Sequence, residues 1–553
     1  MNKQELSDLI FGESGLSLDD LYKKYPKREL VDGAKVTRVG PSPTGFMHIG
    51  GIYASLISER TAHKSNGIYF LRIEDTDKVR EIEGAVDVII NSLKQFNIIP
   101  DEGEVESGIE IGNYGPYRQS QRKEIYKAVV RYLFEKDLAY PCFCSSEDLE
   151  KITKEQEIQK IRPGYRGEWA ICRNKNNEEV ERLIKEGKPF AIRFKSDGNF
   201  ENKIKFKDQV KGDVELSEND LDFVLVKSDG LPTYHFAHVV DDYLMGTTDV
   251  IRGDEWLSSL PLHLQLWRVL EWKTPRYAHI SPIEKIDEGS RRKLSKRKDL
   301  EANVIYYIQK GYPPQGVIEY LLNLANSSFE DWRKANPKND YKEFNFDPKK
   351  LSKSGALLDE VKLNDVCKDI ISQMTAKEIF DRSLSWAKEY EPELAQLFEK
   401  DPSYILKIFS IERSEKGGRK DIAKWLDIKE EISFFFDESF KLTTEEIWQN
   451  LDGTDEQIAK QAVEMFLSNY NEKDSAEEWF SKIKIIAEKL SYAQSAKEFK
   501  ADPGKYKGYV GDIAKIFRVL ITGKIASPDL YQIMQVLGED RVKSRLNKIK
   551  TSF

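Results

Sequence analysis

The sequence predicts an α/β protein with a parallel sheet, followed by a region that contains only helices. A short apolar strand, a glycine-rich turn, a helix and a second strand follow one another over residues 35–73, and this order of elements builds parallel sheets. Strand patterns that resume this sheet return at residues 221–226 and 249–252. Later in the chain explicit helix starts take over, among them the Thr-x-x-Glu capping boxes at Thr375 and Thr443.

Composition and charge exclude several classes of protein. With 553 residues the chain is long enough for roughly three to five domains. Its net charge of −8 means that a polyanionic partner must be bound by local basic patches. No apolar run approaches the ~20 residues of a membrane span, the first thirty residues lack the apolar core of a secretory signal, and four cysteines are too few for a disulfide framework. We therefore expect a cytoplasmic protein that contacts no membrane.

The turn after the first strand is the first candidate for chemistry. Residues 41–51 read Pro-Ser-Pro-Thr-Gly-Phe-Met-His-Ile-Gly-Gly, so His48 and two glycines lie where the strand gives way to the helix. Glycine lets a phosphate approach the backbone, a helix N-terminus attracts anions, and His48 can donate a hydrogen bond to a phosphate oxygen. Taken alone, the segment is equally well explained by an ordinary glycine-rich turn.

A basic segment far along the chain supplies a partner for this turn. Residues 290–298 read Ser-Arg-Arg-Lys-Leu-Ser-Lys-Arg-Lys. A loop of this kind can place Lys293 and Lys296 on a triphosphate as charge accumulates during phosphoryl transfer, although an isolated basic run is more often a solvated loop. Together and in this order, the two segments resemble the paired signature of class I aminoacyl-tRNA synthetases.

Further motifs resemble bacterial glutamyl-tRNA synthetases, from about residue 35 to the carboxyl terminus. They are Arg38-Val-Gly-Pro-Ser-Pro-Thr-Gly-Phe-Met-His-Ile-Gly-Gly, Arg72-Ile-Glu-Asp-Thr-Asp77, Pro232-Thr-Tyr-His-Phe-Ala, Val239-Val-Asp-Asp, Ile251-Arg-Gly-Asp-Glu-Trp256, Lys293-Leu-Ser-Lys-Arg297, Phe517-Arg-Val-Leu-Ile-Thr-Gly-Lys524 and Ser527-Pro-Asp-Leu530. Two positions depart from the family pattern. Gly40 stands where alanine is usual, a difference expected to be harmless, and Gly51 replaces the second histidine of the class signature, as is common in the glutamyl branch.

The resemblance implies a Rossmann-like parallel-sheet catalytic domain with an inserted acceptor-binding domain, followed by an all-α C-terminal anticodon-binding region. The segments expected are an N-terminal extension (1–34), the first half of the catalytic domain (35–117), the insertion (118–230), the second half of the catalytic domain (231–285), a stem-contact region with the Lys-Leu-Ser-Lys-Arg loop (286–370), and two parts of the anticodon-binding domain (371–455 and 456–553). We expect the chain to be a monomer.

In the helical region, Ser527 is expected to cap the last helix, with Pro528 at its first position and Gly538 at its end. Basic side chains there are candidate contacts to a tRNA backbone, although solvated helix faces are the default for any single one. The candidates are Arg413, Lys416, Arg419, Lys420, Lys548 and Lys550.

The implied reaction has two steps, and neither needs a protein nucleophile. The α-carboxylate of glutamate attacks the α-phosphorus of ATP and releases pyrophosphate, and a terminal ribose hydroxyl of tRNA(Glu) then attacks the glutamyl adenylate. Mg²⁺ is expected to be held through the phosphates. The family's ATP-side positions correspond to Ser42, His48, Gly50, Glu255, Lys293 and Lys296, with Trp256 beside them, and His48 and Lys296 are the expected catalytic pair.

The family's glutamate-side positions correspond to Arg38, Glu74, Tyr234, His238 and Arg252. Forked guanidinium groups suit a carboxylate, and Glu74 can hold the α-ammonium, whereas the amide of glutamine would present donors to donors. For each of these side chains alone, a strand-end charge or a packed aromatic ring remains the simpler explanation.

Three cysteines in the insertion raise the question of zinc. Cys142, Cys144 and Cys172 could supply three ligands, and some members of the family bind zinc there. No histidine is near in the sequence and Tyr165 is a poor fourth ligand, so ordinary reduced thiols are the preferred interpretation. Cys367 is interpreted as packing.

Two other functions are consistent with the same scaffold. A glutaminyl-tRNA synthetase is the nearest alternative, but the helical end replaces the strand-rich barrels expected of that branch. A catalytically inactive tRNA-binding paralogue would be expected to lose His48, Lys296 or Glu74, and all three are present. Whether tRNA(Gln) is charged as well does not follow from the sequence.

Overall fold

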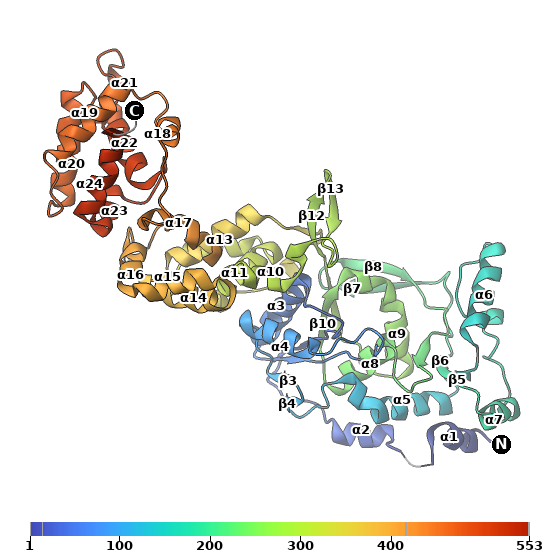
Figure 1. The fold of residues 1–553 in the computed structure, drawn as a ribbon. Coiled ribbons are helices and arrows are strands. Elements are labelled where there is room, and N and C mark those ends of the chain that lie inside the picture. Colours follow the sequence, from blue (N-terminus) through green and yellow to red (C-terminus); the bar gives the residue numbers. More distant parts are fainter. Residues whose placement is uncertain (1, 14, 415–416, 551–553) are drawn as a thin grey trace. The chain divides into compact units, whose positions relative to one another are not determined.

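The structure is a computed structural model that describes residues 2–13, 15–414 and 417–550 (Figure 1). The chain forms two compact units. The first unit comprises Met1–Tyr307 and Ile318–Asp359, and the second comprises Ile308–Val317 and Glu360–Phe553. Among the residues described, no helix combines the length and the apolar character needed to cross a membrane.

The nucleus of the first unit is the predicted strand-helix-strand arrangement. β1 (Val36–Val39) and β2 (Ile68–Leu71) are parallel, with Val36 opposite Ile68, and α3 (Ile49–His63) connects them. The sheet continues through β3 (Glu102–Glu106), which is parallel to β2, and β4 (Ile109–Ile111), which forms an antiparallel hairpin with β3. α4 (Ala85–Gln95) links β2 to β3.

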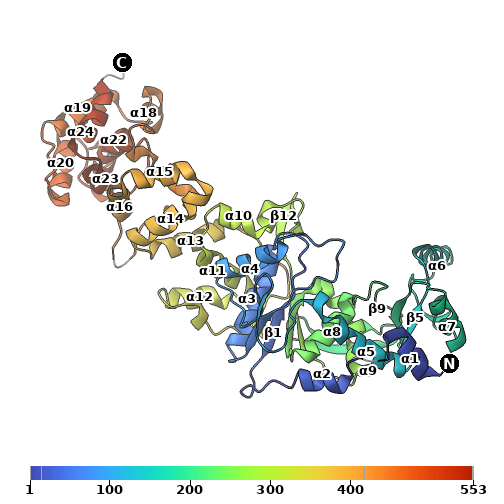
Figure 2. The ribbon, with the colours of Figure 1, turned by 60° about the horizontal axis from the view of Figure 1, so that its bottom comes forward.

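A second parallel pair lies on the other side of β1. β10 (Asp249–Gly253) pairs with β11 (Arg276–Ile280), and the backbone N–H of Thr248 donates to the carbonyl oxygen of Val36 at 2.9 Å. α8 (Tyr234–Leu244) precedes this pair and α9 (Leu260–Val269) connects it. Figure 2 shows α3 on one side of β1 and α8 on the other. The carboxyl ends of β1, β2 and β10 therefore meet at one edge, where open α/β sheets bind ligands.

The insertion contains its own small sheet. β5 (Ala139–Cys142), β6 (Ala191–Phe194) and β9 (Val224–Val226) form it in that order, and β7 (Lys203–Asp208) and β8 (Gly212–Ser217) form a separate hairpin. The expectation that residues 221–226 resume the main sheet is therefore wrong, because β9 pairs with β6. An apolar run indicates a strand but not its neighbour. The helices of this part are α5 (Lys123–Glu135), α6 (Ser146–Ile158) and α7 (Asn177–Lys185).

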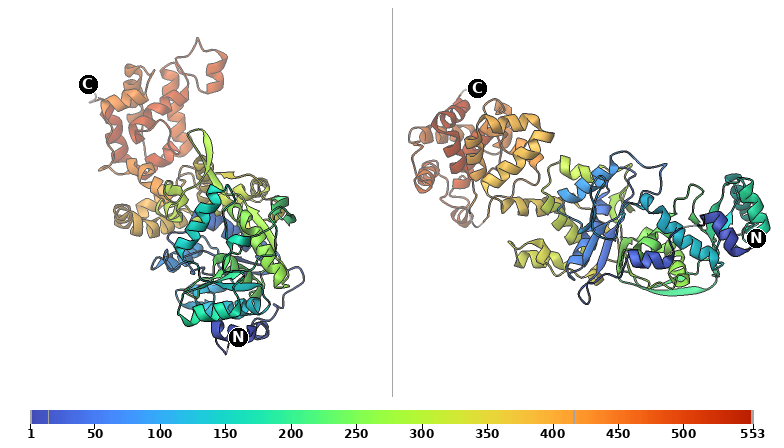
Figure 3. Two further views of the ribbon diagram at one scale, coloured as in Figure 1. Left: turned by 90° about the vertical axis from the view of Figure 1, so that its right-hand side faces the viewer. Right: turned by 90° about the horizontal axis from the view of Figure 1, so that it is seen from below.

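The N-terminal segment packs on the rest of the first unit. α1 (Lys3–Phe11) contacts α5 and α7, and α2 (Leu18–Lys24) contacts α5. This segment can be found next to the N label in both panels of Figure 3. Arg28, just after these helices, donates two hydrogen bonds of 2.7 Å to Glu102. The segment is thus fixed to the sheet by a bidentate ion pair as well as by its helices.

The remaining strands of the first unit carry the basic loop. β12 (Ile283–Asp287) pairs antiparallel with β13 (Ser290–Lys293) and parallel with β14 (Ala356–Leu357). Lys293, the first lysine of the Lys-Leu-Ser-Lys-Arg motif, is the last residue of β13, and Lys296 follows in the loop. Three helices lie between β13 and β14 in the chain, namely α10 (Val304–Gln309), α11 (Pro314–Ala325) and α12 (Ser328–Ala335).

Where it is described, the second unit consists of helices and turns, with nothing more strand-like than isolated bridges. Its helices are α13 (Glu360–Ser372), α14 (Ala376–Tyr390), α15 (Pro392–Lys400), α16 (Pro402–Ser410), α17 (Ile428–Glu431), α18 (Thr444–Asn450), α19 (Glu456–Leu467), α20 (Ala476–Lys489), α21 (Ala496–Ala501), α22 (Val510–Thr522), α23 (Leu530–Leu537) and α24 (Glu539–Asn547). Thr375 and Thr443 cap α14 and α18 through the predicted boxes.

The prediction for the end of the chain needs three corrections. Pro528 is not at the first helical position, because α23 begins at Leu530 and Pro528 precedes its N-cap. Asp529, and not Ser527, caps α23, because its carboxylate accepts the N–H of Gln532 at 2.8 Å while Ser527 accepts from Arg518. Gly538 does end this helix, but α24 follows it, so α23 is not the last helix.

Candidate active site

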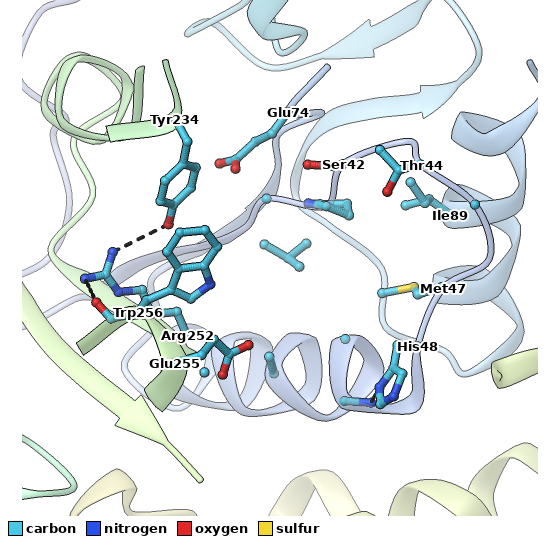
Figure 4. Close-up of a pocket in the computed structure, with 18 of the residues that line it drawn as sticks. Ser42, Thr44, Met47, His48, Glu74, Ile89, Tyr234, Arg252, Glu255 and Trp256 are labelled. Carbon is cyan, nitrogen blue, oxygen red and sulfur yellow. Dashed lines mark hydrogen bonds between the residues drawn. The ribbon is translucent and has the colours of Figure 1, made fainter. Parts of the chain in front are cut away.

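A pocket of about 1040 Å³ opens at the edge where β1, β2 and β10 end. Ten residues predicted for the site line it, namely Arg38, Ser42, His48, Gly50, Glu74, Tyr234, Arg252, Glu255, Lys293 and Lys296, and so does Trp256. Figure 4 shows Arg252, Tyr234 and Glu74 toward one end of this pocket and His48 toward the other. We call these the arginine end (Arg38, Glu74, Arg252) and the lysine end (His48, Lys293, Lys296).

His48 is the N-cap of α3, and its contacts fix its tautomer. Its Nδ1 accepts the backbone N–H of Gly50 at 2.9 Å. Burial and the nearby Lys296 lower the pKa of His48, so the ring is neutral at pH 7. The hydrogen of a neutral ring whose Nδ1 is an acceptor resides on Nε2. His48 can therefore donate a hydrogen bond from Nε2 while the N-terminus of α3 supplies further positive potential.

The two signature segments meet at the lysine end. The Nζ of Lys296 donates to the backbone carbonyl of Phe46 at 2.9 Å, two residues before His48, and Lys293 pairs with Glu255 at 3.1 Å. Asp299 holds the loop in place, because its carboxylate accepts from Arg292 at 2.6 and 2.8 Å and from the backbone N–H of Ser295 at 2.8 Å. Both lysines remain exposed, so they can reach a polyanion.

The arginine end is organised by a buried carboxylate. Asp242 accepts from Nε of Arg38 at 3.1 Å and from a terminal nitrogen of Arg72 at 2.7 Å, and Arg72 also donates to Glu74 at 2.8 Å. Burial alone would raise the pKa of Asp242, but Arg38 and Arg72 outweigh it and hold that pKa well below its usual range. Burial raises the pKa of Glu74, against the opposing effect of Arg72.

Arg252 is anchored at its Nε. That atom donates to Nε2 of His279 at 3.0 Å, whereas the terminal nitrogens make longer contacts of 3.2 to 3.5 Å with His263, Tyr234 and the carbonyl of Trp256. The long contacts are weaker than ordinary N–H···O bonds. The terminal fork can therefore exchange them for a carboxylate without losing its anchor.

His238 lies behind the pocket rather than in its wall. It is fully buried, its ring is stacked against Tyr234, and its Nδ1 lies 2.9 Å from Asp242. Burial lowers the pKa of His238 to about 3. Its Nδ1 also lies 3.4 Å from a terminal nitrogen of Arg38, so His238 supports Arg38 both directly and through Asp242 and is not among the residues that line the pocket.

Gly40 lies where Glu74 needs room. A Cβ built on Gly40 would lie 2.3 Å from Oε1 of Glu74, which is far inside van der Waals contact. With alanine at this position the end of the Glu74 side chain would have to shift, and the expectation that the difference is harmless stays a prediction.

Sequence reasoning gave no role to several residues that hold the site together. Arg72 and Asp242 fell within quoted motifs, and a usable signal was available, because a charge inside an otherwise apolar run indicates a buried ion pair. Asp299 follows the lysine motif directly. His279 and Asp208, which contact one another, are 71 positions apart, and no local pattern joins them.

The three cysteines of the insertion gather at one point. Their Sγ atoms lie within 4.8 Å of one another, and the hydroxyl of Tyr165 lies 3.4 Å from Cys142 and 3.2 Å from Cys144. Three thiols and one hydroxyl are thus close enough together to share one ion, although tyrosine is not among the usual ligands of zinc. Cys367 is buried in the second unit, as predicted.

The basic candidates of the second unit are mostly engaged within it. Arg413 donates to the backbone carbonyls of Ile371 and Met374 at 3.0 and 2.9 Å, and Arg419 pairs with Asp421 at 2.7 Å. Lys420 pairs with Asp369 at 2.6 Å, and Lys548 lies 4.8 Å from the ring centroid of Phe440. Lys416 and the side chain of Lys550 lie outside the described residues.

Two family profiles match the chain, and they agree with this geometry. Residues 35–365 match the catalytic domain of class I tRNA synthetases (E and Q), and residues 416–550 match an anticodon binding domain. Fold, pocket and profile together define a class I tRNA synthetase with an α/β catalytic part and a helical anticodon-binding part.

Similar proteins place the chain more narrowly within this class. It is 48% identical to the glutamate–tRNA ligase of Clostridium beijerinckii and 46% identical to that of Acetivibrio thermocellus, in each case over 99% of this chain and at least 99% of the relative. A crystal structure of the glutamate tRNA ligase from Elizabethkingia meningosepticum in complex with its amino acid is similar with a TM-score of 0.74 and 28% identity, and covers 94% of this chain and 100% of that one. The chain belongs to the glutamate–tRNA ligase family.

Proposed function

We propose that the pocket of the first unit activates L-glutamate with ATP and transfers it to the 3′-terminal adenosine of tRNA(Glu). The observation that carries this proposal is the meeting of the two signature segments, with Lys296 bonded to Phe46 at 2.9 Å, beside two arginines that are each anchored through Nε. One end of the pocket thus suits phosphates and the other suits carboxylates.

The lysine end would act on the phosphates. His48 would donate Nε2–H to a phosphate oxygen, and Lys293 and Lys296 would neutralise the charge that grows as pyrophosphate leaves. Ser42, Gly50 and Glu255 would line the nucleotide. Mg²⁺ would reach the site with ATP, bound mainly through phosphate oxygens. Catalysis would then rest on alignment and on electrostatic stabilisation, because the attacking group is the substrate's own carboxylate.

The arginine end would select the amino acid. The guanidinium groups of Arg38 and Arg252 would face a carboxylate, Glu74 would accept the α-ammonium, and Tyr234 would pack beside them. Glutamine would turn amide hydrogens toward guanidinium hydrogens, which leaves buried donors without acceptors. His238 would act through Tyr234 and Asp242, since its ring touches these residues.

The other parts of the chain would bind the tRNA. We assign its acceptor end to residues 118–230, its stem to 286–370 and its anticodon end to 371–455 and 456–553. We propose that the protein acts as a monomer in the cytoplasm and charges tRNA(Glu), and we leave tRNA(Gln) as a second substrate to be tested.

The thiol cluster supports a structural zinc ion in the insertion, which the sequence alone did not favour. Cys142, Cys144, Cys172 and Tyr165 would hold it, and the ion would supply a cross-link between β5 and the loop that follows α6. Elemental analysis of the purified protein should give one zinc per chain, and Cys144→Ser should lower that ratio sharply. A wild-type chain without bound metal would remove the ion from the account.

Pyrophosphate exchange tests the central proposal. Glutamate should support exchange when tRNA is present, and glutamine should not. Exchange with glutamine only would assign the chain to the glutaminyl branch, and exchange with neither amino acid would indicate an inactive tRNA-binding protein. Charging purified tRNA(Glu) and tRNA(Gln) side by side would then decide which tRNA is accepted.

A further inference from the structure

The two arginines of the pocket are anchored by different chemistry. Nε of Arg38 donates to the carboxylate of Asp242. An ionised carboxylate carries no hydrogen, so both of its oxygens are acceptors. The acceptor for Nε of Arg252 is an imidazole nitrogen, Nε2 of His279 at 3.0 Å. A neutral imidazole accepts at one nitrogen and donates at the other, so this anchor exists only in one of its two tautomers.

Asp208 selects that tautomer. Its Oδ2 lies 2.7 Å from Nδ1 of His279, so the ring donates Nδ1–H to the carboxylate and leaves Nε2 as an acceptor for Arg252. His279 is fully buried and Asp208 is 2% exposed, so water cannot replace either contact. The result is a chain of three groups, from carboxylate to imidazole to guanidinium.

The environment of Asp208 keeps it ionised and fixed. Its Oδ1 accepts the backbone N–H groups of Val210 and Lys211, both at 2.9 Å. Burial would raise the pKa of Asp208, but the bonds from His279 and from these two N–H groups outweigh it and lower that pKa. Asp208 ends β7 in the insertion, so a residue outside both halves of the catalytic domain orients a pocket arginine.

We propose that Asp208 and His279 are positioning residues for glutamate: Asp208 sets the tautomer of His279, which holds Nε of Arg252 so that its terminal fork faces the substrate carboxylate. This inference rests on the proposed function. Neither residue touches the pocket space, and each acts through its neighbour. The terminal nitrogens of Arg252, with contacts no shorter than 3.2 Å, stay available to the ligand.

The substitution Asp208→Asn replaces the acceptor opposite Nδ1 of His279 with a donor and keeps the size of the side chain. The amide oxygen would stay with the N–H groups of Val210 and Lys211, because both are donors. The amide NH₂ would then face Nδ1 of His279 and favour the tautomer with its hydrogen on Nε2. That hydrogen would oppose the Nε–H of Arg252, two donors with no acceptor between them.

The test is steady-state pyrophosphate exchange with tRNA present, measured for the wild type, Asp208→Asn, His279→Phe and the double variant. We expect Asp208→Asn and His279→Phe each to raise the KM for glutamate about 10-fold or more, with kcat and the KM for ATP within about twofold of the wild type. Because Asp208 acts through His279, the double variant should be no worse than His279→Phe alone.

The matched control is Asp249→Asn. Asp249 is equally buried, and its carboxylate binds Gln209, in the same loop as Val210, and Arg276, but it does not contact His279. This variant should leave the KM for glutamate unchanged. Thermal unfolding of all variants separates a loss of fold from a loss of positioning, and His279→Phe keeps the test available if Asp208→Asn does not fold.

Three results would overturn the inference: an unchanged KM for glutamate in Asp208→Asn, an equal rise in the KM for ATP, or additive effects in the double variant. These differ from a failure of the proposed function, which would appear as a wild-type chain without glutamate-dependent exchange.

Discussion

The two ends of the pocket each gather two cations around one buried carboxylate, but they bury the cations to different extents. At the arginine end, Asp242 pairs with Arg38 and Arg72, whose side chains are 5% and 0% exposed. At the lysine end, Asp299 pairs with Arg292 and Lys285, both 28% exposed. One end is therefore a fixed set of charges, and the other is a loop that water still reaches.

This difference matches two different chemical tasks. A buried guanidinium whose anchor is fixed costs little to reorganise when a carboxylate arrives, so it can discriminate between ligands. An exposed lysine can follow phosphate oxygens as charge moves from the α-phosphorus to the leaving group. We infer that selectivity depends on the arginine end and rate on the lysine end.

The largest difference is expected in stability. Asp242→Asn removes the carboxylate that two buried guanidinium groups share, of which Arg72 keeps its bond to Glu74, and should lower the free energy of unfolding by about 3–5 kcal/mol. Asp299→Asn, the same change at the lysine end, should lower it by about 1 kcal/mol or less, because water screens its partners. Denaturant unfolding of both variants checks this. Equal losses would contradict the contrast between the ends.

The next effect concerns turnover. Lys296→Ala should lower kcat by about 100-fold or more and leave the KM for glutamate and the unfolding midpoint unchanged, because the loop lysine acts on developing charge and contributes little to the fold. Pyrophosphate-exchange kinetics and a thermal melt provide the two measurements. Unchanged turnover would remove Lys296 from the mechanism.

The arginine end should give the opposite kinetic pattern. Arg252→Lys keeps the charge but removes the fork and the Nε–H that His279 accepts, so the KM for glutamate should rise about 30-fold while the KM for ATP stays constant. A rise in both constants would mean that the two ends are not independent.

The smallest effect is expected at Gly40. In Gly40→Ala the new methyl group would displace the Glu74 carboxylate and weaken its bond to Arg72, which should cost about 1 kcal/mol and raise the KM for glutamate by a few-fold. Gly45→Ala would be a poor control, since Gly45 has φ +129°. Gly15, which has open space around its Cβ position, is the matched site for Gly→Ala. A variant indistinguishable from Gly15→Ala would show that Glu74 tolerates the methyl group.

The sequence was sufficient to predict those parts of the site that lie in continuous motifs. Strand β1, the turn at His48 and helix α3 followed from apolar spacing and glycine placement, and the lysine loop from its charge. The strand at 221–226 was assigned to the wrong sheet, because pairing is decided by tertiary packing and not by the run itself. The cap of α23 was placed two residues early, since serine and aspartate are both good caps and only geometry chooses between them.

What local patterns could not show was the support behind the pocket. Asp208, His279 and Arg252 come from three separate elements, and neither the spacing nor the charge of any one segment indicates that they touch. The thiol cluster could not be predicted from local patterns either, because Tyr165 contacts Cys142 and Cys144 only after the loop folds back. Such contacts depend on long-range packing, which propensity does not encode.

A crystal structure of this chain with glutamate and a non-hydrolysable ATP analogue tests the account most directly. We expect the carboxylate of glutamate within hydrogen-bond distance of the terminal nitrogens of Arg252, and the phosphates between His48 and Lys296. Phosphates bound at the arginine end, or an amino acid bound away from both guanidinium groups, would contradict it.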